Sequence, residues 1–385
     1  MRLPRALIPI YGTTLADTLG YTLMIPLLPT IVKEYHASYA VAGAMLSVPA
    51  LCSTVAAPVW GKVSDRIGRK PVIIVSQFFS LAGYLLVALA HGLWLVLAAR
   101  IISGFGGGSL GAVESYVADV TSNEQREFAY AIYGAVFGLA FVIGPAASGA
   151  LLRHGLVLPF LLATAIEAAN IIFTWLFVPM QKRARSATSI RETLRAAMAV
   201  GVRRVLLRQF LFILAVVMFL GNFSLFVDRM MHISVAQAAY LLAIAGVVGG
   251  IVLLVFVTPL DKRIGDLWTS QIGLLAGIAA YALFIVSTNT PVFIAATIVW
   301  SVGAAAAEPS LTTLLTKRAK RADRGAIMGL SDSVNSAAMI VGPATGAAII
   351  GLDAHLLPVL PALALAAAFA LGLMTVKQEA VAPGS

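Results

Sequence analysis

The stretch "GKVSDRIGRK", residues 61–70, decides how this chain is interpreted, because it is polar and lies between two long apolar runs. Four basic residues surround Asp65 within it. The chain as a whole has 385 residues, of which 60% are hydrophobic and only 11% are charged. Soluble domains carry about 25% charged residues. The composition therefore predicts a membrane protein, and residues 61–70 are expected to be a short loop between two membrane spans.

On both sides of this loop, apolar runs of about twenty residues recur along the chain. Each run is long enough to cross about 30 Å of hydrocarbon as a helix. We therefore expect an all-α membrane protein with twelve transmembrane helices, at residues 6–32, 40–61, 72–91, 93–118, 128–151, 157–179, 209–228, 235–258, 268–287, 291–316, 326–350 and 356–376.

Basic residues are distributed unevenly between the two sides of these spans. An even number of spans places both termini on one side, and the segments on that side hold most of the 27 Lys and Arg residues. The connections on the opposite side hold only Lys33, Arg153 and Arg229. The positive-inside rule then predicts cytoplasmic termini. The net charge of +10 does not indicate nucleic-acid binding, because the basic residues lie between apolar runs rather than on a soluble module.

The N-terminus begins like a signal peptide, but its apolar run continues to about Val32 and contains Asp17. That length favours a first spanning helix over a cleaved leader. The single cysteine, Cys52, excludes an intrachain disulfide and argues against a structural zinc site. The glycine-rich run "GFGGGSLG" lacks the Lys-Ser/Thr of a phosphate-binding loop. We therefore expect no enzyme activity, no cofactor and no metal site.

The chain also repeats itself. "SDRIGRK" at 64–70 is echoed by "DKRIG" at 261–265, and "VIGPAASGALL" is echoed later by "IVGPATGAAII". These repeats predict two six-helix bundles of like orientation, at residues 1–180 and 209–385. Residues 181–208 would join them as a cytoplasmic linker with a basic amphipathic helix. The second copy of the loop lacks the leading Gly and the final Arg-Lys, so we expect a weaker arrangement there.

The loop at residues 61–70 resembles the signature loop between helices 2 and 3 of the major facilitator superfamily. The resemblance extends over nearly the whole chain through the twelve spans and the repeat. It implies a conformational latch in which Asp65 caps a helix of the other half and Arg69 pairs with Asp119. A carboxylate is favoured at a helix N-terminus by the helix dipole. The residues assigned to this latch are Gly61, Asp65, Arg66, Gly68, Arg69 and Asp119.

Three further spans narrow the resemblance. The fifth span, "GAVFGLAFVIGPAASGALL", resembles a motif typical of drug/proton antiporters. Small residues at this spacing let helices approach closely, and proline bends the helix. The first span, "LADTLGYTLMIPLLPTI", resembles that of twelve-span antiporters, which include tetracycline exporters and vesicular amine transporters. The fourth span resembles the family's arginine-containing motif through Arg100, Gly104 and Gly106. The fifth-span motif comprises Gly134, Gly138, Gly144, Pro145 and Gly149.

An ionisable group inside a membrane costs about 2.5–3.5 kcal/mol or more at the centre and indicates function. Asp17 is about eleven residues into the first span, roughly 16 Å along it and near the midplane. It is the candidate carrier of a coupling proton. Arg100 enters the fourth span from the outside and is the candidate partner that stabilises ionised Asp17. The alternatives are a hydrogen bond between packed helices for Asp17 and a structural ion pair for Arg100.

Other polar side chains inside the predicted spans are candidates for substrate binding. Each has an alternative as a buried polar pair that only holds helices together, or as a group that reaches water at the membrane surface. The candidates are Glu114, Glu167, Asn170, Asn222, Glu308, Asp332 and Asn335.

Taken together, these features favour a secondary active transporter. The first hypothesis is proton-coupled export of small hydrophobic or cationic compounds by alternating access, by a monomer in a bacterial inner membrane. Its partners would be the lipid bilayer, a small-molecule substrate and protons. A second hypothesis is a dedicated transporter, exporter or importer, of a single metabolite, siderophore or lipid. A third is a membrane scaffold or sensor that does not transport.

Overall fold

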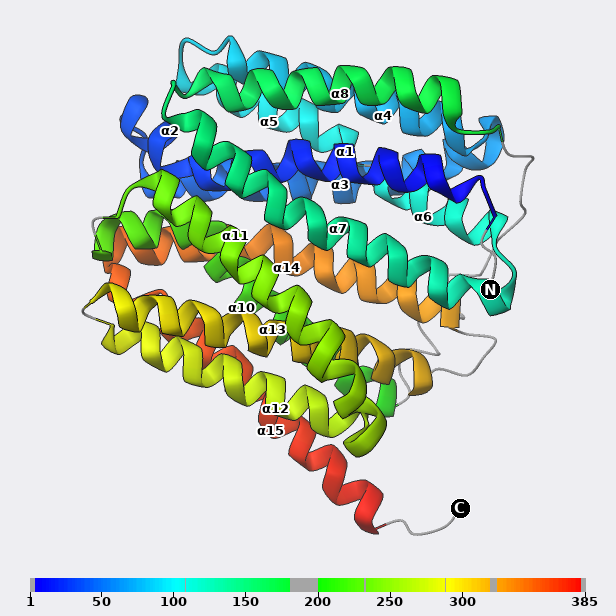
Figure 1. Ribbon diagram of the computed structural model, residues 1–385, viewed down its shortest axis with the longest axis vertical. Coiled ribbons are helices and arrows are strands. Elements are labelled where there is room, and N and C mark those ends of the chain that lie inside the picture. The colour runs from blue at the N-terminus through cyan, green and yellow to red at the C-terminus, as the bar shows by residue number, and fades with distance from the viewer. Residues whose placement is uncertain are drawn as a thin grey trace. The chain divides into compact units, whose positions relative to one another are not determined.

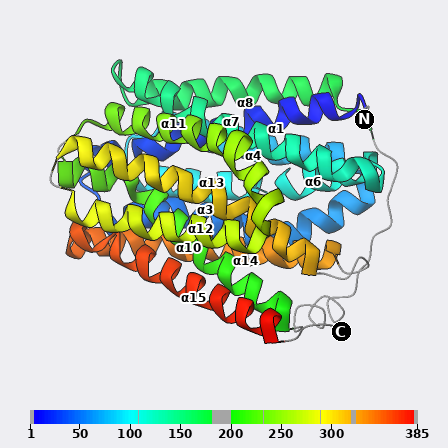
Figure 2. The ribbon, with the colours of Figure 1, turned by 60° about the horizontal axis from the view of Figure 1, so that its bottom comes forward.

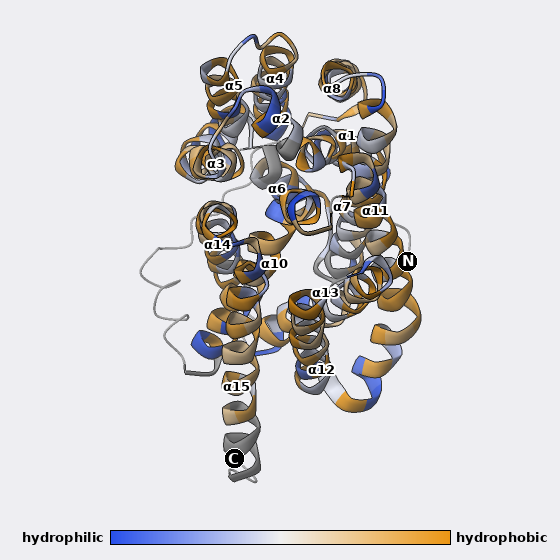
Figure 3. Ribbon diagram, turned by 90° about the vertical axis from the view of Figure 1, so that its left-hand side faces the viewer, coloured by the Kyte–Doolittle hydropathy of each residue, from blue (hydrophilic) through white to orange (hydrophobic). Residues whose placement is uncertain are grey.

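The structure is a computed structural model, and every element it describes is helical (Figure 1). Apolar residues predominate along these helices (Figure 3), and large apolar side chains such as Phe78, Trp175 and Leu254 are exposed. Such side chains suit a lipid environment, in which helices satisfy their own backbone hydrogen bonds. The described residues are 4–107, 109–180, 200–231, 233–287, 289–318 and 324–381.

The first half of the chain contains eight helices in these ranges. A single 3₁₀ turn, Ile25–Leu27, separates the first two, so one predicted span is divided. The span predicted at 93–118 is also divided, within its glycine-rich run, where helix propensity is low. The helices are α1 (Leu7–Met24), α2 (Leu28–Glu34), α3 (Tyr39–Ile67), α4 (Arg69–Ala88), α5 (Leu93–Gly106), α6 (Ser109–Val120), α7 (Asn123–Leu152) and α8 (Val157–Phe177).

The second half follows the same plan with longer helices. A π-helical turn, Leu253–Val257, and a short 3₁₀ turn, Ala354–Leu356, interrupt it. The helices are α10 (Val200–Met231), α11 (Val235–Val252), α12 (Thr258–Val286), α13 (Thr290–Arg318), α14 (Arg324–Leu352) and α15 (Val359–Val381).

Ten segments of the described residues are long and apolar enough to cross a membrane. Helix α1 is not among them, because four threonines and Asp17 make it more polar than the others. The segment Val235–Val286 counts once although it contains two predicted spans. Gly265 divides it, since its φ of 81° and ψ of 158° are not helical. With α1 and this division, the twelve expected spans are accounted for.

The chain forms two compact units, one of Met1–Ser186 with Ile233–Ala243 and one of Ala187–His232 with Ile244–Ser385. These limits differ from the predicted ones, since the beginning of α11 groups with the first unit. Residues 200–208 were assigned to the linker but form the beginning of α10. Arg208 is fully buried there, because Gln271 and the Ala368 carbonyl accept hydrogen bonds from its guanidinium. The rest of the predicted linker helix, residues 181–199, lies outside the described residues.

Helix packing repeats between the two units, each taken by itself. In the first unit α1 packs against α7 and α8, and α4 packs against α5 and α8 (Figure 2). In the second unit α10 packs against α14 and α15, and α12 packs against α13 and α15. The sequence repeat is therefore also a repeat of helix packing.

Candidate functional site

Residues 61–70 form the end of α3, a sharp turn and the beginning of α4. Gly68 makes the turn with φ 100° and ψ 164°, a conformation that side chains other than glycine rarely adopt. Gly61 has open space around it, and the side chain of Arg66 is exposed. The glycine thus directs Arg69, the first residue of α4, back toward the chain that precedes it.

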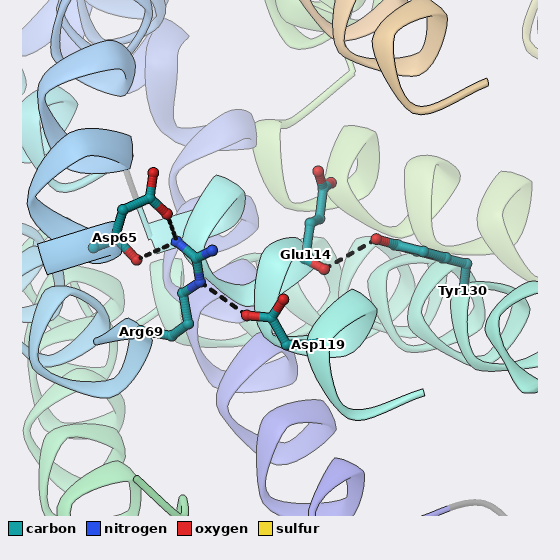
Figure 4. A network of polar contacts seen from close by, with 6 residues as sticks. Asp65, Arg69, Glu114, Asp119 and Tyr130 are labelled. Atoms are coloured by element: carbon teal, nitrogen blue, oxygen red, sulfur yellow. Dashed lines mark hydrogen bonds and ion pairs between the residues drawn. The ribbon is translucent and has the colours of Figure 1, made fainter. Parts of the chain in front are cut away.

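Arg69 lies at the centre of a cluster of polar contacts (Figure 4). Its Nε donates to Asp119 Oδ2 at 3.1 Å, which ties α4 to α6. Its Nη1 donates to Asp65 Oδ1 at 2.6 Å and to Ser64 Oγ at 3.0 Å, which ties α4 to α3. The side chains of Arg69 and Asp119 are only 9% and 15% exposed, whereas that of Asp65 is 48% exposed. The structure therefore brings together Arg69 and Asp119, the two residues that the resemblance pairs.

The second copy of this loop carries an ion pair of the opposite polarity. Gly265 repeats the positive φ of Gly68, but the next residue is Asp266 where the first copy has an arginine. Asp266 pairs with Lys317 in the last turn of α13, as Arg69 pairs with Asp119 in the last turn of α6. Lys317 is 63% exposed, so water screens this pair more. The second copy of the loop therefore also forms an ion pair, with the acidic and the basic residue exchanged between the two helices.

A buried polar cluster joins α1, α4 and α8 within the first unit. Asn170 Nδ2 donates to Asp17 Oδ1 at 2.8 Å and to the Thr13 carbonyl at 3.3 Å. Thr174 Oγ1 lies 3.0 Å from Thr13 Oγ1 and accepts a hydrogen bond of 3.0 Å from Gln77 Nε2. Asp17 is half-buried, and the other four side chains are almost fully buried. The midplane acid predicted on the first span therefore lies in a prepared polar environment.

Glu167 lies one turn before Asn170 on α8, with its side chain fully buried. Among the described residues, neither of its carboxyl oxygens accepts a hydrogen bond. The carboxyl group of Asp17 interacts directly with that of Glu167. The sequence assigns Glu167 and Asn170 to substrate binding, and the structure places both beside the predicted proton carrier.

Arg100 is buried in α5, where its side chain contacts two other segments of the first unit. Its Nε donates to the Met45 carbonyl at 2.9 Å, and a terminal nitrogen contacts Met24 Sδ at 3.1 Å. Tyr84 on α4 experiences the charges of Arg100, Asp17 and Glu167 alike. Arg100 therefore contributes positive potential to this region, while the hydrogen bond to Asp17 comes from Asn170.

The remaining candidates have other contacts within their own units. The carbonyl of Glu114 accepts a hydrogen bond of 2.9 Å from Tyr130, and its side chain points away from Arg69 (Figure 4). Asn222 is fully buried and donates to the Met218 and Pro343 carbonyls at 2.9 and 3.0 Å, which links α10 to α14. Both N–H groups of the Asn222 side chain are therefore used, one within α10 and one to hold α10 to α14.

Three other candidates of the second unit lie on α13 and α14. The side chains of Glu308 and Asp332 are exposed, and Asn335 follows Asp332 by about one turn. These positions leave the two acids accessible. Their assignment to substrate binding remains a prediction.

The glycines of the fifth-span motif divide into two kinds. Gly134 and Gly138 have no other heavy atom within 4 Å of where a Cβ would lie. A Cβ on Gly144 would collide with Thr22, whose hydroxyl donates to the Ala140 carbonyl at 3.0 Å. Gly149 lies against the beginning of α11 in the same unit. Only the later part of the motif therefore serves close helix packing within its unit.

Sequence reasoning missed three members of the buried cluster. Thr13 precedes Asp17 by four residues, and Thr174 follows Asn170 by four. Residues four apart share one face of a helix, so each pair forms a polar stripe within an apolar run. That spacing could have identified Thr13 and Thr174 as members of a polar cluster. For Gln77 in α4, the only indication in the sequence is a polar side chain within an apolar run.

Comparison with known proteins agrees with this geometry. Residues 10–343 match the Major Facilitator Superfamily, and residues 228–384 match it again. The class C tetracycline resistance protein of Escherichia coli is 27% identical over 365 residues, which cover 92% of each chain. Multidrug resistance protein 1 of Bacillus subtilis is 23% identical over 346 residues, covering 88% of this chain and 87% of that one.

Two solved structures share the fold. The nucleoside transporter NupG superposes with a TM-score of 0.80 and 14% identity, over 96% of this chain and 99% of that one. The human organic anion transporter MFSD10 superposes with a TM-score of 0.74 and 22% identity, over 96% of this chain and all of that one. The chain therefore belongs to the major facilitator superfamily and is a membrane transporter homologous to tetracycline and multidrug efflux proteins.

Proposed function

We propose that this protein exports small hydrophobic or cationic compounds in exchange for protons. The observation that carries the proposal is Asp17, a half-buried acid in the middle of α1 that is held by Asn170 on α8. An acid at this depth is energetically costly, and such residues usually serve a functional step such as the movement of a proton. The similarity to tetracycline and multidrug resistance proteins supports export of drug-like compounds.

In this mechanism Asp17 takes a proton from outside, and the protein then opens inward. Substrate enters from the cytoplasm or the inner leaflet, Asp17 releases its proton inside, and the substrate leaves to the outside. Each positive charge that moves inward gains about 2.3 kcal/mol per 100 mV of membrane potential. Arg100 adds positive potential near the cluster and favours the ionised form of Asp17. Acids such as Glu114, Glu308 and Asp332 would attract cationic substrates.

The cluster around Arg69 would act as the conformational latch. Its ion pair with Asp119 joins α4 to α6 at their polar ends, and Asp65 remains half-exposed and available to cap a helix of the other half. Closing this cluster would stabilise the outward-facing state, and opening the inside would break its bridge between the halves. The charge-reversed pair of Asp266 and Lys317 would be a weaker equivalent.

The surroundings follow from the same argument. The concentration of basic residues on one side predicts cytoplasmic termini. The bacterial origin of the resistance proteins to which the chain is similar supports an inner-membrane location. Each unit contains its own packed helices, and we propose that the monomer is the working form.

The test uses inside-out vesicles that contain the protein and an energised pH gradient. A panel of tetracyclines, lipophilic cations and neutral drugs is added, and collapse of the gradient is followed by fluorescence. Asp17→Asn is compared with Glu34→Gln, which removes an exposed acid at the end of α2. We expect gradient collapse that depends on the compound, is lost in Asp17→Asn and is retained in Glu34→Gln.

Two outcomes would refute the proposal. Gradient collapse that persists in Asp17→Asn would remove Asp17 as the proton carrier. An absence of response to every compound, in vesicles shown to contain folded protein, would leave a dedicated transporter of one metabolite, siderophore or lipid as the better hypothesis.

A further inference from the structure

The buried cluster of the first unit has more hydrogen-bond acceptors than donors. Both N–H groups of Asn170 are used, one by Asp17 and one by the Thr13 carbonyl. The two oxygens of Glu167 and Oδ1 of Asn170 are buried and have no donor among the described residues. Buried polar groups in folded proteins are almost always paired, and a buried ionised carboxylate without a donor is strongly unfavourable. The cluster therefore needs an additional hydrogen.

The side chains of both Asp17 and Asn170 lie against the Glu167 carboxyl. Since both N–H groups of Asn170 already have acceptors, Asp17 is the group that can share a hydrogen with Glu167. Two ionised carboxylates repel each other and cannot hydrogen-bond, whereas a carboxylic acid donates readily to a carboxylate. We propose that Asp17 and Glu167 form one proton-binding site. In it, the O–H group of protonated Glu167 donates a hydrogen bond to the Asp17 carboxylate. This proposal rests on the proposed function and makes Glu167 part of the proton pathway rather than of the substrate site.

The two acids differ in their access to water. Asp17 is half-buried, whereas the Glu167 side chain is fully buried. Asp17 therefore exchanges protons with the aqueous side, and Glu167 stores the proton that Asp17 passes to it. In the transfer, the Asp17 acid loses its hydrogen to a Glu167 carboxylate, so one O–H bond breaks and one forms. The pair keeps a single proton and a net charge of one negative unit before and after.

The other ionisable groups that face this pair are few. Tyr84 on α4 is in electrostatic contact with both acids, and Tyr21 on α1 and Arg100 on α5 also act on Tyr84. Both tyrosines stay neutral at physiological pH. Arg100 is the positive group that acts on the same tyrosine, Tyr84, as the two acids.

The second unit shows that packing alone does not require these acids. Helices α10 and α15 pack against each other as α1 and α8 do. The sequence of α10 from Val200 to Val227 and that of α15 from Val359 to Met374 contain no acidic residue. The corresponding helix pair of the second unit therefore packs without acids in these ranges. This favours a functional rather than a packing role for Asp17 and Glu167 in the first unit.

Infrared difference spectroscopy on the purified protein tests the shared site directly, because protonated carboxyl groups have their own C=O band. The variants are Glu167→Gln, Asp17→Asn, and Glu34→Gln as the control. We expect the wild type and the control to show a buried carboxylic acid at neutral pH and Glu167→Gln to lose that band. In Asp17→Asn the pH dependence of the Glu167 band should differ from that of the wild type, because the second carboxyl of the pair is gone.

Two results would overturn the proposal. One is a band that persists in Glu167→Gln, and the other is a Glu167 titration that Asp17→Asn leaves unchanged, which would show independent acids. If either single variant fails to fold, the exchange variant Asp17→Glu/Glu167→Asp keeps both acids and should retain the coupled titration. This measurement needs no substrate, so an absence of compound-driven proton movement by the wild-type protein in vesicles would refute the proposed function while leaving the shared site intact.

Discussion

Removing the ion pair between Arg69 and Asp119 should cost about 2 kcal/mol of coupling free energy. Exposed ion pairs contribute about 0.2–1 kcal/mol, whereas a hydrogen bond to a charged group contributes about 1.5–3 kcal/mol. The two side chains are only 9% and 15% exposed, so the second range applies. The contact of Arg69 with Asp65, which is 48% exposed, should contribute about 0.5 kcal/mol.

A double-mutant cycle separates these contributions. The variants Arg69→Ala, Asp119→Ala and their combination give the first coupling energy, and the same cycle with Asp65→Ala serves as the matched control. The free energy of unfolding is measured in mixed micelles of a mild detergent and a denaturing one. A coupling energy for Arg69 and Asp119 no larger than that for Arg69 and Asp65 would refute the reasoning from burial.

Three further outcomes follow from the helix packing. Gly144→Val should destabilise the protein by about 2 kcal/mol or more, because the new side chain would clash with Thr22. Gly138→Val should change the free energy of unfolding by less than about 0.5 kcal/mol, because the space beside Gly138 is open. Equal effects of the two variants in thermal unfolding would contradict this reasoning. Gly265→Ala should cost about 1–2 kcal/mol through backbone strain alone, because no atom lies within 4 Å of its Cβ position. Asn222→Leu should cost about 1–3 kcal/mol, since it removes the donor to the Pro343 carbonyl; an unchanged unfolding free energy would exclude that link.

Some of the molecule could be predicted from the sequence because local physics determines it. The length of an apolar run determines a span, and the order Gly68, Arg69 determines a turn that sends a basic side chain backward. The partner Asp119 came from the family resemblance, and the structure has that contact. These features depend on neighbours in sequence or on a recurring motif.

Other parts of the site depend on contacts between distant segments. Asn170 and Asp17 are 153 residues apart, and nothing in either helix alone indicates that they meet. Arg100 donates to the Met45 carbonyl, 55 residues before it in the chain, and the charge of Arg100 alone does not indicate that contact. Asp266 occupies the position of Arg69 in the second copy of the loop, so from the sequence the ion pair seemed to be absent there. Its partner Lys317 lies 51 residues later in the chain.

The polarity of α1 has a consequence for how the protein is made. An acid at a helix centre costs about 2.5–3.5 kcal/mol on membrane insertion, and α1 is not apolar enough to count among the candidate spans. Its packing partners α7 and α8 begin only at Asn123 and Val157. At about 5–20 residues per second, a ribosome needs roughly 10–30 s to complete them. Helix α1 therefore leaves the ribosome well before the helices that it packs against, and it is expected to settle in the bilayer only after they have formed.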